Sequence, residues 1–330
     1  MLDLDRRLIF VFGKGGVGRT TVSTALGLAR AARGEKTLLV QWAIQDSISP
    51  LLGAEPCEHR HAEVRENLYV MNFSGPEALR EYFVEHLGMK LFYKMIIENN
   101  QVRRLIHAAP GLEELFFLGR LFWLVELARD ERNIYFDRII VDAPATGHGS
   151  ALFGIVGTVS KFDFEGPLVN ETRRVTNLIL DADKTGALLV TLPEELPVDE
   201  TLEFLPVLER DLQRPPLALI MNRSLIRSAE QSLRGPDGVH AFSTPDGEPD
   251  WFRHFSNELQ SMEARAGANA LLADLQRRLQ MEKRTRQSVT LPVLSLPDVL
   301  IRQPGANPAE RIAALVPFFE AGFAAPRERT

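Results

Sequence analysis

The stretch FGKGGVGRTT, residues 12–21, decides the fold of this 330-residue chain. It follows an apolar run, residues 7–12, and precedes a helical pattern that ends at Gly34. Its four glycines let backbone N–H groups approach phosphate oxygens closely, and the following helix directs its positive end at the same place. Residues 13–20 match the pattern G-x-x-x-x-G-K-[ST], except that Arg19 stands where the pattern has lysine. The stretch therefore predicts a phosphate-binding loop.

The loop also predicts a ligand. The residues expected to bind nucleotide are Gly13, Lys14, Gly15, Gly16, Val17, Gly18, Arg19, Thr20 and Thr21. The Thr20 hydroxyl stands where such loops hold Mg²⁺. Arginine has a longer, planar charged group, so Arg19 can neutralise phosphate but should stabilise a transferring phosphoryl group less well than lysine does. The alternative is a tight strand-to-helix turn without a ligand. It would not explain why the glycines, the threonine pair, the strand and the helix occur together.

Six apolar runs predict the rest of the core. Their hydrophobic residues are consecutive, which is typical of parallel strands buried on both faces. They span residues 7–12, 36–42, 138–143, 186–192, 216–222 and 290–296. The stretch NLYVMNFSGPEALREYF, residues 67–83, predicts a further strand followed by a helix. Helical patterns between these runs predict an α/β fold with a doubly wound, mainly parallel sheet. We expect a single P-loop NTPase domain over residues 1–330, with helical insertions at approximately 75–132, 151–183 and 251–286.

The bulk composition limits the partners. A net charge of -6 and a pI near 5.8 argue against a protein that grips nucleic acid by its overall charge. The single Cys57 excludes an intramolecular disulfide and a thiolate metal cluster. The first residues lack the layout of a signal peptide, and charges interrupt the most apolar stretches, so we expect a cytoplasmic protein.

Two motifs carry a resemblance to a known family. GKGGVGRT, residues 13–20, resembles the deviant Walker A motif, and VDAPATGHGSALF, residues 141–153, resembles the second switch segment of the arsenite-pump ATPases. That family includes the ATPase for guided entry of tail-anchored membrane proteins. Further matches follow in the same order over roughly residues 7–320. The resemblance implies ATP and Mg²⁺ as ligands.

The resemblance also implies roles for particular residues. Lys14 would reach across a dimer to the partner's nucleotide. Asp142 would hold Mg²⁺ through water, together with Thr20. Asn222 would bond the adenine edge, and Pro297 would lie near the base. Each strand-end residue has a plainer alternative, namely that Asp142 caps a turn and that Asn222 and Pro297 only end their strands.

The chain departs from the family after its second strand. There the family has an aspartate that positions the attacking water, but the register places Ala43 at this position, and alanine cannot orient water. Asp46 is the nearest residue that could replace this aspartate. The favoured interpretation, however, is that Asp46 is a solvated loop acid. The candidate catalytic residues are therefore Lys14, Arg19 and Asp46.

The sequence leaves three hypotheses for the function. The first is an ATP-binding, dimeric switch with weak or absent hydrolysis, paired with itself or with a full-motif paralogue. The second is an active ATPase that energises anion export or delivers a hydrophobic membrane-protein client. The third is a client-binding module formed by the Phe- and Leu-rich helix at 112–128, for which internal packing is the favoured alternative. Whether the chain is an enzyme depends on the altered positions Arg19 and Ala43.

Overall fold

A computed structural model describes the chain over most of the predicted sheet. The described residues are 3–43, 45–57, 59–73, 112–127, 134–144, 152, 167–232, 262–299, 305–320 and 323. Within these ranges eight strands form one sheet in the order β3-β4-β2-β5-β1-β6-β7-β8. The strands are β1 (Leu8–Gly13), β2 (Thr37–Trp42), β3 (Ala62–Arg65), β4 (Leu68–Phe73), β5 (Arg138–Asp142), β6 (Thr185–Thr191), β7 (Ala218–Ser224) and β8 (Val293–Pro297).

The sheet is parallel except at one edge, where β3 pairs antiparallel with β4. The α/β fold with a mainly parallel sheet is thus confirmed. β1 lies between β5 and β6. Strands β2, β4 and β3 lie beyond β5 on one side, and β7 and β8 lie beyond β6 on the other, so the strand order reverses direction at β1. Ligands of open α/β sheets bind at such a switch point, beyond the carboxyl ends of the strands. The glycine-rich loop leaves β1 there.

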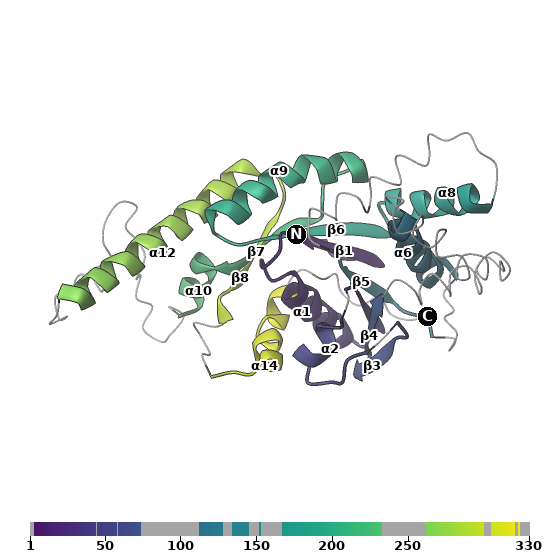
Figure 1. Cartoon of the computed structure of the whole chain (residues 1–330), viewed down its shortest axis with the longest axis horizontal. Helices are drawn as coiled ribbons and strands as arrows, with labels where there is room; N and C mark the ends of the chain where they lie inside the picture. Colours follow the sequence, from purple (N-terminus) through teal and green to yellow (C-terminus); the bar gives the residue numbers. More distant parts are fainter. Residues whose placement is uncertain are drawn as a thin grey trace, which may run out of the picture.

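Helices cover both faces of the sheet (Figure 1). The helices are α1 (Arg19–Ala31), α2 (Ile48–Leu51), α6 (Leu112–Phe122), η2 (Trp123–Leu127, a π-helical turn), α8 (Pro167–Leu180), α9 (Glu195–Leu212), α10 (Leu225–Ser232), α12 (Met262–Ser288), α14 (Pro308–Ala313) and α15 (Val316–Glu320). Figure 1 shows α1, α2 and α14 on one side of the sheet and α6, α8, α9 and α12 on the other. The long α12 packs against α9 and α10.

Side-chain alternation along β1 builds both halves of the core, because successive residues of a strand point to opposite faces. Phe10 and its neighbours on that face join α6, α8 and α9 in one buried cluster. Val11 and its neighbours on the other face join α1 and α15 in a second cluster. Each cluster holds more than twenty buried apolar side chains, and their burial anchors β1 and the start of its loop.

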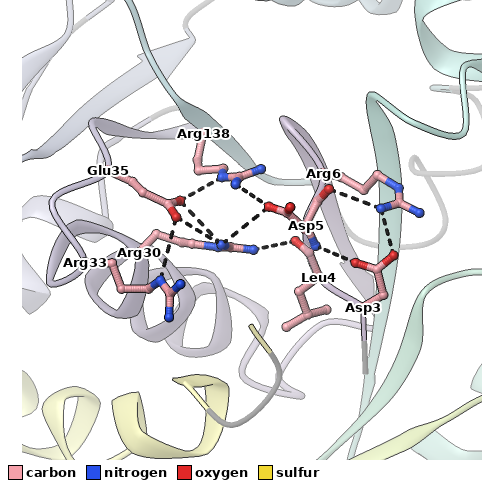
Figure 2. A network of polar contacts seen from close by, with 8 residues as sticks. All are labelled: Asp3, Leu4, Asp5, Arg6, Arg30, Arg33, Glu35 and Arg138. Atoms are coloured by element: carbon pink, nitrogen blue, oxygen red, sulfur yellow. Dashed lines mark hydrogen bonds and ion pairs between the residues drawn. The ribbon is translucent and has the colours of Figure 1, made fainter. Parts of the chain in front are cut away.

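A network of charged side chains lies at the amino ends of the strands, opposite the carboxyl ends where the loop lies (Figure 2). The Arg30 side chain is only 2% exposed; it donates to the Leu4 carbonyl at 2.6 Å and lies 3.3 Å from Glu35. Arg138 donates to Glu35 at 2.7 Å and also pairs with Asp5. Burial, together with the charge of Arg138, lowers the pKa of Arg30 to about 10. Arg30 therefore stays charged at neutral pH and ties α1 to the strands.

The predicted strands are found with ends shifted by up to three residues, but β3 was not predicted. Its Ala62–Arg65 segment is short and half exposed, so it lacks the continuous apolar run of the others. Of the predicted insertions, the structure describes α6 and η2, α8, and α12; the remaining parts lie outside the described residues. The single-domain organisation stays a prediction.

The helix at 112–128 faces inward over its described length. Phe117, Leu121 and Leu124 are buried in the same cluster as the β1 side chains, which agrees with the internal-packing interpretation. Client binding by this helix stays a prediction. Among the described helices, none combines the length and the apolar character that a membrane crossing requires.

Candidate nucleotide site

The glycine-rich loop is held by an asparagine from β7. The Asn222 side-chain amide donates to the Val17 carbonyl at 2.9 Å. Gly18 precedes α1 with φ +87°, and a Cβ there would lie 2.3 Å from the Asn222 amide nitrogen. A Cβ at Gly13 would lie 2.6 Å from the Val190 carbonyl oxygen. Glycine is thus required at both ends of the loop, because neighbouring groups occupy the space of a side chain.

Asp142, at the carboxyl end of β5, is the centre of a polar cluster. The Thr20 hydroxyl donates to its carboxylate at 2.6 Å, and the Ser23 hydroxyl lies 3.5 Å away. The Gln41 amide donates to it at 3.3 Å. The Asp142 side chain is 4% exposed, and burial raises its pKa above the usual value, although the Thr20 bond and the Arg19 charge oppose this.

The oxygen atoms of this cluster fit Mg²⁺. The ion is usually held by one or two carboxylates together with the phosphates of a nucleotide, and the Asp142 carboxylate beside the Thr20 hydroxyl offers that donor set. Over the described ranges, no group of three or more His, Cys, Asp or Glu side chains could hold a metal without such help. The described residues would therefore supply only part of the coordination.

Arg19 is directed along the sheet edge. Its guanidinium donates to the carbonyl of Ala143, the residue after Asp142. The side chain is half-buried, and burial lowers the pKa of Arg19 while the Asp142 charge opposes the shift. In this arrangement Arg19 connects the start of α1 to the start of the predicted second switch segment, of which residues 145–151 lie outside the described part.

Lys14 lies on the surface beside α9. It forms an ion pair with Glu200 of the same chain, and the Lys14 side chain is 47% exposed. An exposed ion pair of this kind contributes little to stability. Lys14 therefore remains accessible to other anionic groups.

Asp46 is not the solvated loop acid that we expected. It is 8% exposed, and one carboxylate oxygen accepts from the backbone N–H groups of Ile48 and Ser49 at 2.8 and 3.2 Å. The other accepts from the N–H and the thiol of Cys57 at 2.9 and 3.2 Å. Burial acts to raise the pKa of Asp46, but the bonds from Ser49 and Cys57 outweigh it and hold this pKa below its usual value. Both oxygens thus hold the segment 46–57 together, and a catalytic role stays a prediction.

The predicted adenine contacts lie on neighbouring strands. Asn222 is 6% exposed in β7, and Pro297 ends β8, where it pairs in register with Ser224. The two residues therefore share the carboxyl edge of the sheet with the loop. Their contact with a base stays a prediction.

Sequence reasoning missed three polar residues of this edge. Ser23 lies one helical turn after Thr20, so its position on the same face of α1 could have been inferred. Gln41 is a buried amide between the apolar residues Val40 and Trp42, a signal that was available. Glu200 carries no local signal, because only the tertiary fold brings α9 to the loop.

Together the fold and the loop define the class of protein. The parallel sheet, the loop between β1 and α1 and the acid at the end of β5 are those of a P-loop NTPase fold. Residues 6–164 match the family described as anion-transporting ATPase. Through these residues the chain is similar to the anion-transporting ATPase family.

Individual relatives agree with this similarity. The ATPase BagA of Mycobacterium tuberculosis is 32% identical over 228 residues, which cover 66% of this chain and 65% of the relative. The putative arsenical pump-driving ATPase 2 of Aquifex aeolicus is 27% identical over 66% of this chain and 80% of its own length. The ATPase get3 of Schizosaccharomyces japonicus is 27% identical over 49% of this chain and 50% of its own. The chain thus spans just under two thirds of the mycobacterial relative.

Proposed function

We propose that the chain binds Mg·ATP and acts as a nucleotide-dependent dimeric switch or partner subunit, with weak or absent hydrolysis. The observation that carries this proposal is the contrast within the site. Asp142 and Thr20 form a buried oxygen cluster suited to Mg²⁺, whereas the Arg19 guanidinium bonds the Ala143 carbonyl. Ala43 offers no group to orient an attacking water. Binding is thus supported, while two aids to phosphoryl transfer are altered.

The exposure of Lys14 supports the dimeric part of the proposal. A cation at the surface of the loop can reach a second molecule, and its pairing with Glu200 is one that water and salt weaken. The partner would be a second copy of this chain or a full-motif paralogue. No nucleic-acid partner is proposed.

An active ATPase is the second candidate, and the comparisons favour it. Relatives carry the names arsenical pump-driving ATPase and ATPase get3. By analogy this chain would energise anion export or deliver a hydrophobic client, with Arg19 and another base replacing the missing groups. Fold-level analogy alone does not decide between the candidates.

Nucleotide affinity and single-turnover hydrolysis, measured on the same preparation, distinguish the switch from the active ATPase. The switch proposal expects Mg·ATP binding with turnover far below about 1 s⁻¹, the lower end of ordinary enzymes. The double variant Arg19→Lys with Ala43→Asp should then raise hydrolysis at least tenfold, because it restores a compact charge and a water-orienting acid. The exposed Arg210→Lys is the matched control and should change nothing. Turnover near 1 s⁻¹ by the unaltered chain would establish the active ATPase instead.

A further inference from the structure

Gln41 occupies an unusual position in the sheet. It is 5% exposed in β2, between apolar residues, and its in-register neighbour on β5 is Asp142. A buried amide is costly unless it is hydrogen-bonded. Its side-chain partners are therefore informative.

The Gln41 side chain joins two parts of the molecule. Its amide nitrogen donates to the Asp142 carboxylate at 3.3 Å and to the Ser47 hydroxyl at 2.6 Å. Its carbonyl oxygen accepts from the Ser47 backbone N–H at 2.8 Å. Ser47 immediately precedes α2. One planar amide thus connects the acid of the candidate site to the start of α2.

The bonds continue beyond Ser47. The adjacent Asp46 binds the backbone of Ile48, Ser49 and Cys57. The segment 46–57 is therefore an internally bonded unit, and Gln41 links it to Asp142. Hydrogen bonds therefore lead from Asp142 through Gln41 to Ser47, and the peptide bond to Asp46 connects them to the bonds that hold this segment.

The geometry points to Gln41 as a positioning residue that orients Asp142 for Mg·nucleotide and transmits occupancy of the site to segment 46–57. This inference rests on the proposed function and deepens it, because it identifies the element that would respond in a nucleotide-dependent switch. When a bound ligand orders Asp142, the amide of Gln41 is ordered with it, and so is Ser47. Occupied sites should therefore show a less mobile segment 46–57.

Hydrogen exchange tests the transmission. In the unaltered chain, Mg·ATP should slow amide exchange of residues 45–57 about threefold or more relative to ATP with EDTA. Gln41→Met keeps the side-chain length but removes all three side-chain hydrogen bonds, so this protection should disappear. The gain in ATP affinity on adding Mg²⁺ should also fall about tenfold, since a hydrogen bond to a charged group is lost, while Mg²⁺-free ATP binding should stay unchanged.

Gln45→Met is the matched control, since Gln45 is an exposed glutamine just after β2, and it should behave as the unaltered chain. Should Gln41→Met fail to fold, Ser47→Ala alters an exposed side chain and should halve the protection or more. Full protection in Gln41→Met, or in Ser47→Ala where Gln41→Met does not fold, would overturn the inference while leaving the proposed function intact. Absence of any ATP binding by the unaltered chain would overturn both, and that result is visible before any variant is made.

Discussion

At the scale of single residues, burial of ionisable groups sets the chemistry of this molecule. Asp142 and Cys57 are both removed from water, and burial raises the pKa of each above its usual value. Asp142 lies in the candidate site, where a carboxylate is needed for a cation. Cys57 instead donates its thiol hydrogen to Asp46. We therefore expect a role in ligand binding for Asp142 but not for Cys57, and an effect of both groups on the stability of the fold.

We expect Asp142→Asn to raise the thermal stability of the ligand-free chain, by on the order of 1 kcal/mol, and to abolish the effect of Mg²⁺ on ATP binding. A raised pKa in an acid means that the folded state prefers the protonated form, so its ionised form costs stability at neutral pH. A neutral amide avoids this cost. Thermal melts and titration with Mg·ATP measure the two effects.

Asp298→Asn is the contrasting variant. Its carboxylate is 1% exposed but accepts from Arg223 at 2.8 Å, so its loss should destabilise the chain. Equal effects of the two substitutions would contradict the expectation for Asp142.

Cys57 predicts a pH dependence. Burial, aided by the Asp46 carboxylate, raises the pKa of this thiol from 9.0 to about 12. The unfolded chain therefore loses the thiol proton above pH 9 while the folded chain keeps it, and the contribution of Cys57 to stability falls as the pH rises from 9 towards 12. Thiolate absorbance should show no step near pH 9 in the folded protein and a full step in denaturant. Cys57→Ala should remove that step, and a native titration near pH 9 would refute the prediction.

At the scale of elements, the loop and the first helix depend on close approach between strands. Gly18 has a positive φ and faces Asn222 of β7. Arg30, near the other end of α1, anchors the helix to the amino ends of β1 and β5 through the charged network in Figure 2. Each end of α1 is thus fixed by a contact that a single substitution can remove.

Gly18→Ala should weaken ATP binding at least tenfold, because the added Cβ meets the Asn222 amide and the backbone resists φ +87°. Calorimetric titration measures the loss. Gly267→Ala in α12, away from the loop, is the control, since nothing lies within 4 Å of a Cβ built there. Adding Asn222→Ala to Gly18→Ala should recover only part of the affinity, because it relieves the clash but not the backbone strain.

Arg30→Met should lower the free energy of unfolding by about 3 kcal/mol. The substitution removes one partner from a buried charge network and leaves the Leu4 carbonyl and Glu35 with fewer donors. Denaturant unfolding measures this loss. Arg210→Met, at a side chain that is 71% exposed, should change the stability by less than about 0.5 kcal/mol. A similar small effect at Arg30 would show that the network contributes nothing net.

At the scale of the whole molecule, association is the property that the proposed function requires. Lys14 stands on the surface of the loop, where the resemblance implies that it reaches a partner's nucleotide. Its ion pair with Glu200 must open for this to happen. Because the pair is exposed, opening it costs little.

We expect Mg·ATP to shift the chain, alone or mixed with a full-motif paralogue, towards dimers in sedimentation. Lys14→Ala should reduce this association about tenfold, since a charge-assisted bond to phosphate is lost. Lys36→Ala, an exposed lysine at the opposite edge of the sheet, should leave association unchanged. Dimers that form equally well in all three proteins would argue against a role of Lys14 across the interface.

Local pattern accounts for much of what could be predicted. The glycine loop, the apolar run before it and the helix after it are contiguous, so their physical requirements are visible in the single stretch of residues 7–34. The position of Asp142 at a strand end was likewise predictable, because the apolar run 138–143 stops there. β3 escaped prediction since half of its short length faces water.

The sequence alone determined an α/β sheet and a phosphate loop, because periodicity and glycine placement act between near neighbours in the chain. Only the tertiary structure decided which side chains meet. Gln41 faces Asp142 through the register of β2 and β5, Asn222 fills the space that Gly18 leaves, and Glu200 reaches Lys14 from α9. Such contacts depend on strand order and packing, which no short stretch of sequence contains.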